Sequence, residues 1–209
     1  MNRTAYVLFI LLMALTARAQ NFEGKIVYQN KYKSKLPNVT DEQFANMMGT
    51  TQEYYIKGNN YKSVTDGKLM LWQLYIHADN KIYNKLSNTD VLLWNDASEN
   101  KDSVLKAEII KNADTVLGYP CDELVLTCTS GLQKYYYNAA LSIDASQYIH
   151  HRFGNWYEVV SRIHALPLKE IVDNAQFTME NVATAVTPMN VDDQLFALPA
   201  DAKTMKNPY

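Results

Sequence analysis

Residues 51–86, TQEYYIKGNNYKSVTDGKLMLWQLYIHADNKIYNKL, decide the fold. Short runs that favour strands alternate here with turn sequences, which are Gly58-Asn59-Asn60, Asp66-Gly67 and Ala78-Asp79-Asn80. Asn, Asp and Gly favour tight turns because they accept backbone conformations that other residues avoid. The spacing predicts four consecutive strands, at 51–57, 61–65, 68–77 and 81–86. Turns at such short intervals are typical of an antiparallel sheet, a sandwich or a barrel.

The strand at 68–77 is the most apolar of the four. Alternation places Met70, Trp72, Leu74 and Ile76 on one face, and the opposite face is apolar as well. A strand that is apolar on both faces is usually buried on both faces. We therefore expect this strand to be covered on both sides.

The same pattern extends over most of the chain. In 22–32, aromatic and aliphatic side chains alternate with polar ones, which is typical of a half-buried strand. Further strands are predicted at 91–94, 103–111, 123–129, 132–138, 168–172 and 177–188. No internal repeat and no Pro- or Gly-rich linker divides the sequence, so we expect a single domain.

Few segments have helical spacing. Thr40 and Gln43 match a capping box ahead of a short amphipathic helix at 41–48, which Gly49 ends. Short helical segments are also expected at 144–149, 156–163 and 192–196, and the spacing in 156–163 is compatible with a strand as well. The chain is therefore predicted to be mainly β, of the α+β class.

Composition excludes several classes of protein. The chain has 209 residues, of which 47% are hydrophobic and 20% charged, so it can bury a core and is not disordered. A formal net charge of −2 without a long basic run argues against nucleic-acid binding. Two cysteines are too few for a disulfide-rich scaffold.

Residues 1–19 have the pattern of a secretory signal peptide. Arg3 precedes the apolar run 5–15, and small residues then supply a cleavage site before Gln20. The run is too short for a transmembrane helix, which takes about 20 residues. We expect an exported protein in the periplasm, or associated with the outer membrane, of a Gram-negative bacterium. The domain is expected to comprise 20–202, and the polar tail 203–209 is expected to be loose.

The sequence shows none of the common catalytic, nucleotide-binding or metal-binding motifs. It contains no G-x-S-x-G, P-loop or dinucleotide-binding motif. Two of its four histidines are the adjacent His150 and His151, which does not match the spacing of zinc ligands. We therefore predict no catalytic residues, no metal site and no cofactor. A secreted enzyme stays the least favoured hypothesis.

The two cysteines, Cys121 and Cys128, fall in or beside one predicted strand. Along an extended strand, positions seven apart lie about 23 Å from each other. A disulfide needs Cα atoms within about 7 Å, so only a hairpin between the two residues would allow it. We expect free buried thiols, and a disulfide is the less favoured alternative.

Three motifs in the second half of the chain carry a family resemblance. Leu117-Gly118-Tyr119-Pro120-Cys121 ahead of a strand resembles the GY-x-C element of a family of uncharacterised exported bacterial proteins. Leu195-Phe196-Ala197-Leu198-Pro199 after the strand 177–188 is similar to the closing F-x-L-P pattern of that family and of LolA/LppX-like carriers of lipoproteins and lipids. Ala165-Leu166-Pro167-Leu168 occupies the place of a Gly-Leu-Pro element in the related GLPGLI group, with Ala165 instead of Gly.

The resemblance implies a curved antiparallel sheet that forms a half-barrel, with one or more short helices on its concave side. In the carriers, that concavity holds acyl chains. The sequence contains 15 tyrosines, which either are ordinary strand residues or line a pocket with a hydrated rim. We predict that the concave face carries Tyr28, Tyr55, Met70, Trp72, Leu74 and Phe177.

Two hypotheses for function follow. In the first, the protein binds a lipid or another apolar small molecule, which requires a cavity of several hundred cubic ångströms. In the second, it is an envelope structural or interaction protein with an envelope protein as its partner. This hypothesis requires a concavity filled by the protein's own side chains and an exposed apolar patch or sheet edge.

Overall fold

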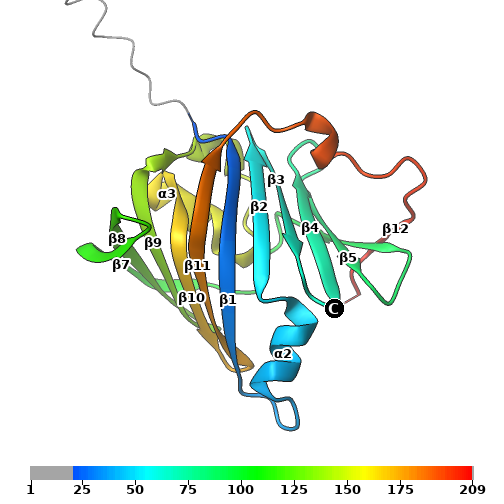
Figure 1. Cartoon of the computed structure of the whole chain (residues 1–209), viewed down its shortest axis with the longest axis horizontal. Coiled ribbons are helices and arrows are strands. Elements are labelled where there is room, and N and C mark those ends of the chain that lie inside the picture. Colours follow the sequence, from blue (N-terminus) through cyan, green and yellow to red (C-terminus); the bar gives the residue numbers. More distant parts are fainter. Residues whose placement is uncertain (1–20, 209) are drawn as a thin grey trace, which may run out of the picture.

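The computed structural model describes residues 21–208, so the predicted signal peptide lies outside the described residues. These residues form one open sheet of 12 strands in the order β12-β6-β5-β4-β3-β2-β1-β11-β10-β9-β8-β7 (Figure 1). All neighbours are antiparallel except β12 and β6, which are parallel. The predicted fold class, a mainly β curved sheet with short helices, is confirmed.

Most strands follow one another as hairpins, as the turn signals predict. Their bounds are β1 Gly24–Ser34, β2 Thr51–Lys57, β3 Asn60–Thr65, β4 Met70–Ile76, β5 Lys81–Leu86, β6 Leu92–Asp96, β7 Val104–Val116, β8 Tyr119–Cys128, β9 Gly131–Ser142, β10 Ala165–Asn174, β11 Phe177–Pro188 and β12 Thr204–Lys206. β1 pairs with β11 near the end of the chain, and this pairing joins the first half of the sheet to the second.

The helical elements are short. They are α2 Asp41–Met48, η2 Ala145–Tyr148, η3 Phe153–Asn155, α3 Trp156–Ile163 and η4 Asp193–Phe196. The capping box of α2 is present as predicted, because the Thr40 side chain accepts a hydrogen bond from Gln43 N and the Gln43 side chain accepts one from Thr40 N. Residues 156–163 adopt the helical alternative.

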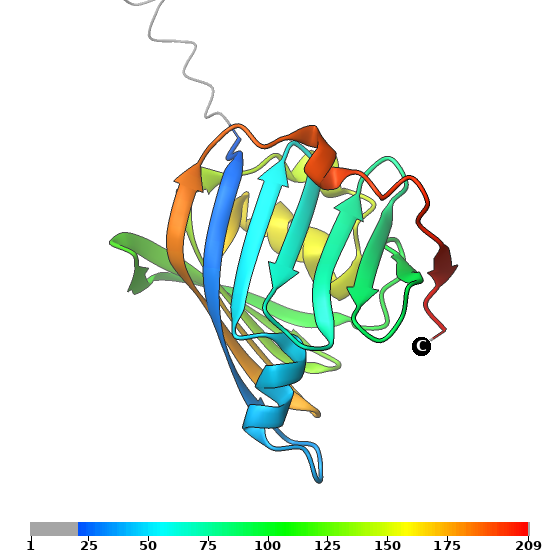
Figure 2. The ribbon, with the colours of Figure 1, turned by 45° about the vertical axis from the view of Figure 1, so that its right-hand side comes forward.

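The sheet curls around α3, which lies in its concavity (Figure 2). We call the face of the sheet that α3 covers the inner face and the opposite one the outer face. Val160 belongs to the large core cluster, which has residues of β1 to β5 and of β7 to β11, whereas Val159 and Ile163 belong to a second cluster with residues of β8 and β9. All three side chains are buried. One helix of eight residues therefore fills the space between the two arms of the sheet.

The outer face of β4 and β5 is covered by the C-terminal segment 189–203. Val191 and Phe196 of this segment pack on Leu74 and Tyr83. β4 is consequently covered on both sides, as its sequence predicts, with Leu74 buried on the outer face and Tyr75 buried on the inner face. Beyond this segment, Thr204–Lys206 pairs with β6. These three residues are part of the sheet, which corrects the prediction of a loose tail.

None of the helices in the described part of the chain is both long and apolar enough to cross a membrane.

Replacement of Phe196 by Ala tests the outer cover. The side chain is 7% exposed, so the change leaves a cavity against Leu74 and Tyr83. We expect the free energy of unfolding to fall by about 3–4 kcal/mol, as for large-to-small changes in cores. Urea unfolding followed by tryptophan fluorescence measures it. Met189→Ala, in the same segment but 44% exposed, is the control and is expected to cost about 0.5 kcal/mol or less. Equal losses in the two variants would contradict the assigned role of the segment.

Candidate functional site

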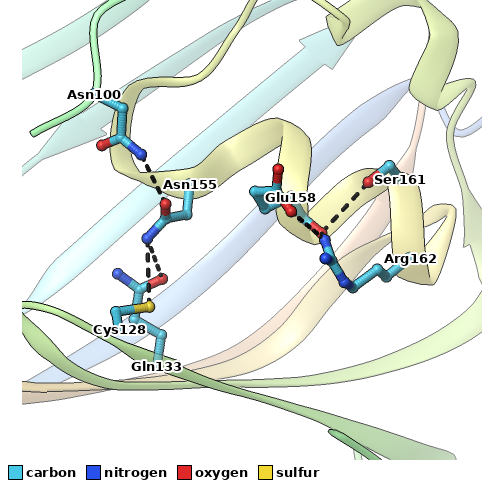
Figure 3. A network of polar contacts seen from close by, with 7 residues as sticks. All are labelled: Asn100, Cys128, Gln133, Asn155, Glu158, Ser161 and Arg162. Carbon is cyan, nitrogen blue, oxygen red and sulfur yellow. Dashed lines mark hydrogen bonds and ion pairs between the residues drawn. The ribbon is translucent and has the colours of Figure 1, made fainter. Parts of the chain in front are cut away.

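The N-terminus of α3 is fixed by a buried polar network (Figure 3). Asn155 adopts the left-handed conformation, with φ 63°, and is 1% exposed. Its Nδ2 donates to Asp102 Oδ2 at 3.0 Å and to Gln133 Oε1 at 3.3 Å, and its Oδ1 accepts from Asn100 Nδ2 at 2.7 Å. The side chain thus ties the helix to the loop before β7 and to the start of β9.

Asp102 is the charged member of this network. It accepts hydrogen bonds from the Thr129 hydroxyl and from the backbone N–H and hydroxyl of Ser130, at 2.7–2.9 Å. These bonds outweigh the effect of its partial burial, so the pKa of Asp102 is lowered. Since its oxygens are already engaged in structural bonds, we assign Asp102 to holding α3 in place.

An aromatic cluster lies beneath α3 on the inner face. The rings of Tyr54, Tyr61 and Tyr75 stack in sequence, with centroids 5.2–5.4 Å apart. His151 closes the cluster, because its Nε2 lies 2.7 Å from Tyr61 Oη and its ring lies 4.3 Å from that of Tyr75. Burial lowers the pKa of His151 to about 3, so this histidine is neutral at ordinary pH. Many of the tyrosines noted in the sequence are thus core residues.

A small pocket remains between this cluster, α3 and β10. Its volume is about 60 Å³, and its lining consists of Tyr28, Gln52, Tyr54, Trp156, Leu166, Pro167, Glu170 and Asn181. Several of its polar groups are paired: Tyr28 Oη donates to Pro167 O at 2.8 Å, and Asn181 Nδ2 donates to Gln52 Oε1 at 3.0 Å. The volume is that of about two water molecules.

Three other groups make this pocket unusual. The buried Tyr54 Oη and Trp156 Nε1 have no hydrogen-bond partner among the described residues. The third is the carboxyl of Glu170, whose pKa is raised to about 7 because burial disfavours the charged form. A donor left unpaired in a protein interior costs free energy, so an oxygen atom from outside the chain suits this position.

The structure separates the six residues that were predicted to line the concavity. Tyr28 lies on the inner face in the pocket under α3. Phe177 lies near the α2 end of the sheet, where its ring is 5.1 Å from that of Phe44. Met70 pairs with Leu86, and the backbone of the neighbouring Leu69 bonds to Met47 of α2. Tyr28 therefore does not share a single cavity with Met70 and Phe177.

Tyr55, Trp72 and Leu74 lie on the outer face, which corrects the predicted position. They pack in or against the cluster that segment 189–203 covers. Alternation along β4 correctly places Trp72 and Leu74 on one face, but it does not show which face is concave, and the register shift between Met70 and Trp72 puts Met70 on the other face. Trp72 lines an open hollow of about 450 Å³ with residues 199–203, and Lys62 Nζ lies 4.9 Å above its ring.

Two further open hollows occur around the loop 95–103. One of about 560 Å³ lies between this loop, Phe153, Gly154 and residues 206–208, and another of about 380 Å³ lies beside Arg152 and Tyr157. Both are open and include Asp102, which is engaged in the network that holds α3. Within residues 21–208, no three His, Cys, Asp or Glu side chains are grouped so as to hold a metal ion.

The free edge of β7 is the most exposed apolar part of the sheet. β7 pairs only with β8, and its other edge ends the sheet. Leu105, Ile109 and Ile110 on this strand are 67%, 46% and 48% exposed. The edge carries unpaired backbone N–H and C=O groups, which can accept another strand. Sequence reasoning missed this edge, because the order of strands in a sheet is not encoded in any one strand.

Cys121 and Cys128 are free thiols, both on β8 and both buried. Burial raises the pKa of each, to about 11 for Cys128. A thiol with a raised pKa is a poor nucleophile and a poor metal ligand. Cys128 instead packs beside Asn155 in the network of α3.

Comparison of the sequence with protein-family models and with curated proteins found no match.

Replacement of Glu170 by Gln tests how much stability the chain loses by burying the charged form of the Glu170 carboxyl. Between pH 4.5 and about 7, the folded chain keeps a proton on Glu170 that the unfolded chain has released, so wild-type stability falls as pH rises through this window. Glu170→Gln removes this loss. The free energy of unfolding of the variant is compared with that of wild type at each pH. We expect this difference to be about 1–3 kcal/mol more favourable to the variant at pH 8 than at pH 4.

Urea unfolding at several pH values measures the effect. Glu180→Gln, on the neighbouring strand but on the outer face beside Lys169, is the matched control. This variant controls for the loss of a carboxyl group from the neighbouring strand. The same pH dependence in wild type and Glu170→Gln would show that Glu170 does not titrate in this window.

Proposed function

We propose that the chain is an exported envelope protein that acts as an interaction module, with a self-filled half-barrel and a free sheet edge as its binding surface. The proposal chooses the second of the two hypotheses drawn from the sequence. Its family relationship to the GLPGLI group and to LolA-like proteins stays a prediction, as do its export and its location in the periplasm or at the outer membrane.

The observation that carries the proposal is the filling of the concavity by α3. Val159, Val160 and Ile163 are buried against both arms of the sheet, and Asn155 anchors the helix. The pocket beneath α3, between β2 and β10, measures about 60 Å³, and the hollows of about 380–560 Å³ described above are open at the surface. Pockets for lipids and other small molecules have volumes of about 300–1,000 Å³. An acyl chain would therefore have to displace α3 from its contacts.

The edge of β7 supplies what the interaction hypothesis requires. It is a 13-residue strand at the end of the sheet, with apolar side chains exposed on it. An added strand gains main-chain hydrogen bonds from such an edge and buries its side chains against the exposed ones. A protein partner that presents an extended segment is the kind of partner that fits.

Native mass spectrometry of mature 20–209, purified from a bacterial periplasm, tests this choice. We expect the polypeptide mass without a bound lipid, before and after solvent extraction, and no uptake of a fluorescent fatty acid. A stoichiometric mass that disappears on extraction and matches a phospholipid or an acyl chain would overturn the proposal.

The pocket at Glu170 favours a second candidate function, the binding of an apolar ligand by its polar head. Tyr54 Oη and Trp156 Nε1 lack partners among the described residues, and both line this pocket beside the Glu170 carboxyl. The head group of a carboxylic acid could accept their hydrogen bonds. Fatty-acid uptake that is lost in Trp156→Phe but kept in Trp72→Phe, on the outer face, would support this candidate.

A further inference from the structure

We infer that the partner of the β7 edge is a second copy of the same chain, paired antiparallel about a twofold axis at Ala107. The inference rests on the proposed function and names its partner. In this arrangement Lys106 of each copy lies opposite Glu108 of the other, and two 12-stranded sheets join edge to edge.

The exposed strand has one regular stretch that can accept such pairing. The β7–β8 ladder shifts register between Val104 and Lys106 and again between Ile110 and Asp114. Between these irregularities, residues 106–110 pair with β8 in unbroken register. Bulges bend a strand away from a flat partner, so pairing from outside is expected to centre on this stretch.

Charge selects the register. Lys106 Nζ and Glu108 Oε1 form an ion pair at 2.8 Å within one chain, so both side chains project from the same face of β7. They are 63% and 55% exposed at the free edge. With the twofold axis at Ala107, the residue numbers of any two facing positions add up to 214. Lys106 of each copy therefore lies opposite Glu108 of the other, so this pair occurs twice. Opposite charges in facing positions stabilise a strand pair.

Neighbouring registers lack this match. An axis at Lys106 or at Glu108 brings two like charges into facing positions, which is destabilising. An axis at Ile109 places Glu108 opposite Ile110 and Lys106 opposite Asn112, so neither charge meets its opposite. Among these registers, the one at Ala107 alone makes the edge complementary to itself.

The same register also brings exposed apolar side chains together. Leu105, which is 67% exposed and lies at the register shift that bounds the regular stretch, comes next to Ile109, which is 46% exposed. A twofold axis perpendicular to the sheet keeps the inner faces of both copies on the same side. The side chains of facing positions then lie on the same face of the joined sheet, as strand pairing requires.

Charge reversal tests this register with full-length mature chain. We expect wild type to be dimeric in analytical ultracentrifugation. Lys106→Glu and Glu108→Lys each place like charges opposite each other at two positions, and each is expected to raise the dissociation constant about tenfold or more. A mixture of the two variants restores both opposite-charge pairs and is expected to form a heterodimer, which native mass spectrometry resolves by mass.

The double variant K106E/E108K is expected to dimerise as wild type does, because the swapped charges again face their opposites. Lys31→Glu, an exposed lysine on the central strand β1, is the control for a change of charge alone and is expected to stay dimeric. Far-UV circular dichroism and thermal melting check that each variant is folded.

A wild-type chain that is monomeric at 100 µM would overturn the inferred dimer, and so would single variants that dimerise as tightly as wild type. Neither result bears on the filled concavity. A co-purifying lipid, in contrast, would overturn the proposed function whether or not the chain is dimeric. The two failures are therefore distinguishable.

Discussion

The sheet carries apolar side chains on both faces, and the need to cover both governs the rest of the structure. On the inner face α3 meets this need, because Val160 is part of the large cluster that spans both arms and Val159 is part of the cluster on β8 and β9. On the outer face the segment 189–203 does so through Phe196. The hydrogen bonds of Asn155 hold the inner cover, since lifting α3 would leave buried polar groups unpaired. The concavity is thus closed by the same contacts that stabilise the fold.

Features with a local cause could be predicted from the sequence. The helix at 41–48 depends on Thr40 and Gln43, and β2 and β5 are bounded by turn residues, so all three begin and end where predicted. β7, β8 and β9 are longer than predicted because their outer parts are held by pairing between strands. At most positions of β7 the side chains are exposed, and they show no alternation that could reveal its length.

The positions of the site residues depended on information that no single strand contains. Alternation separates the two faces of β4, but only the path of 189–203 decides that Leu74 and Trp72 face outward. The register shift between Met70 and Trp72 adds a second obstacle, because an extra residue reverses which face the next side chain occupies. The Glu170 pocket joins β2, α3 and β10, so it becomes visible only when these elements are placed together.

The two ends of the sheet differ, and this asymmetry supports a role for β7. At one end β12 is a three-residue strand, too short to offer a long edge. At the other end β7 presents 13 residues without a proline. Proteins usually protect such edges, because unpaired strands invite indiscriminate association. Lys106 and Glu108 limit that risk, since most registers leave their charges unmatched or opposed. The same two charges favour a partner strand that places an acidic residue opposite Lys106 and a basic residue opposite Glu108. An antiparallel copy of β7 is such a partner.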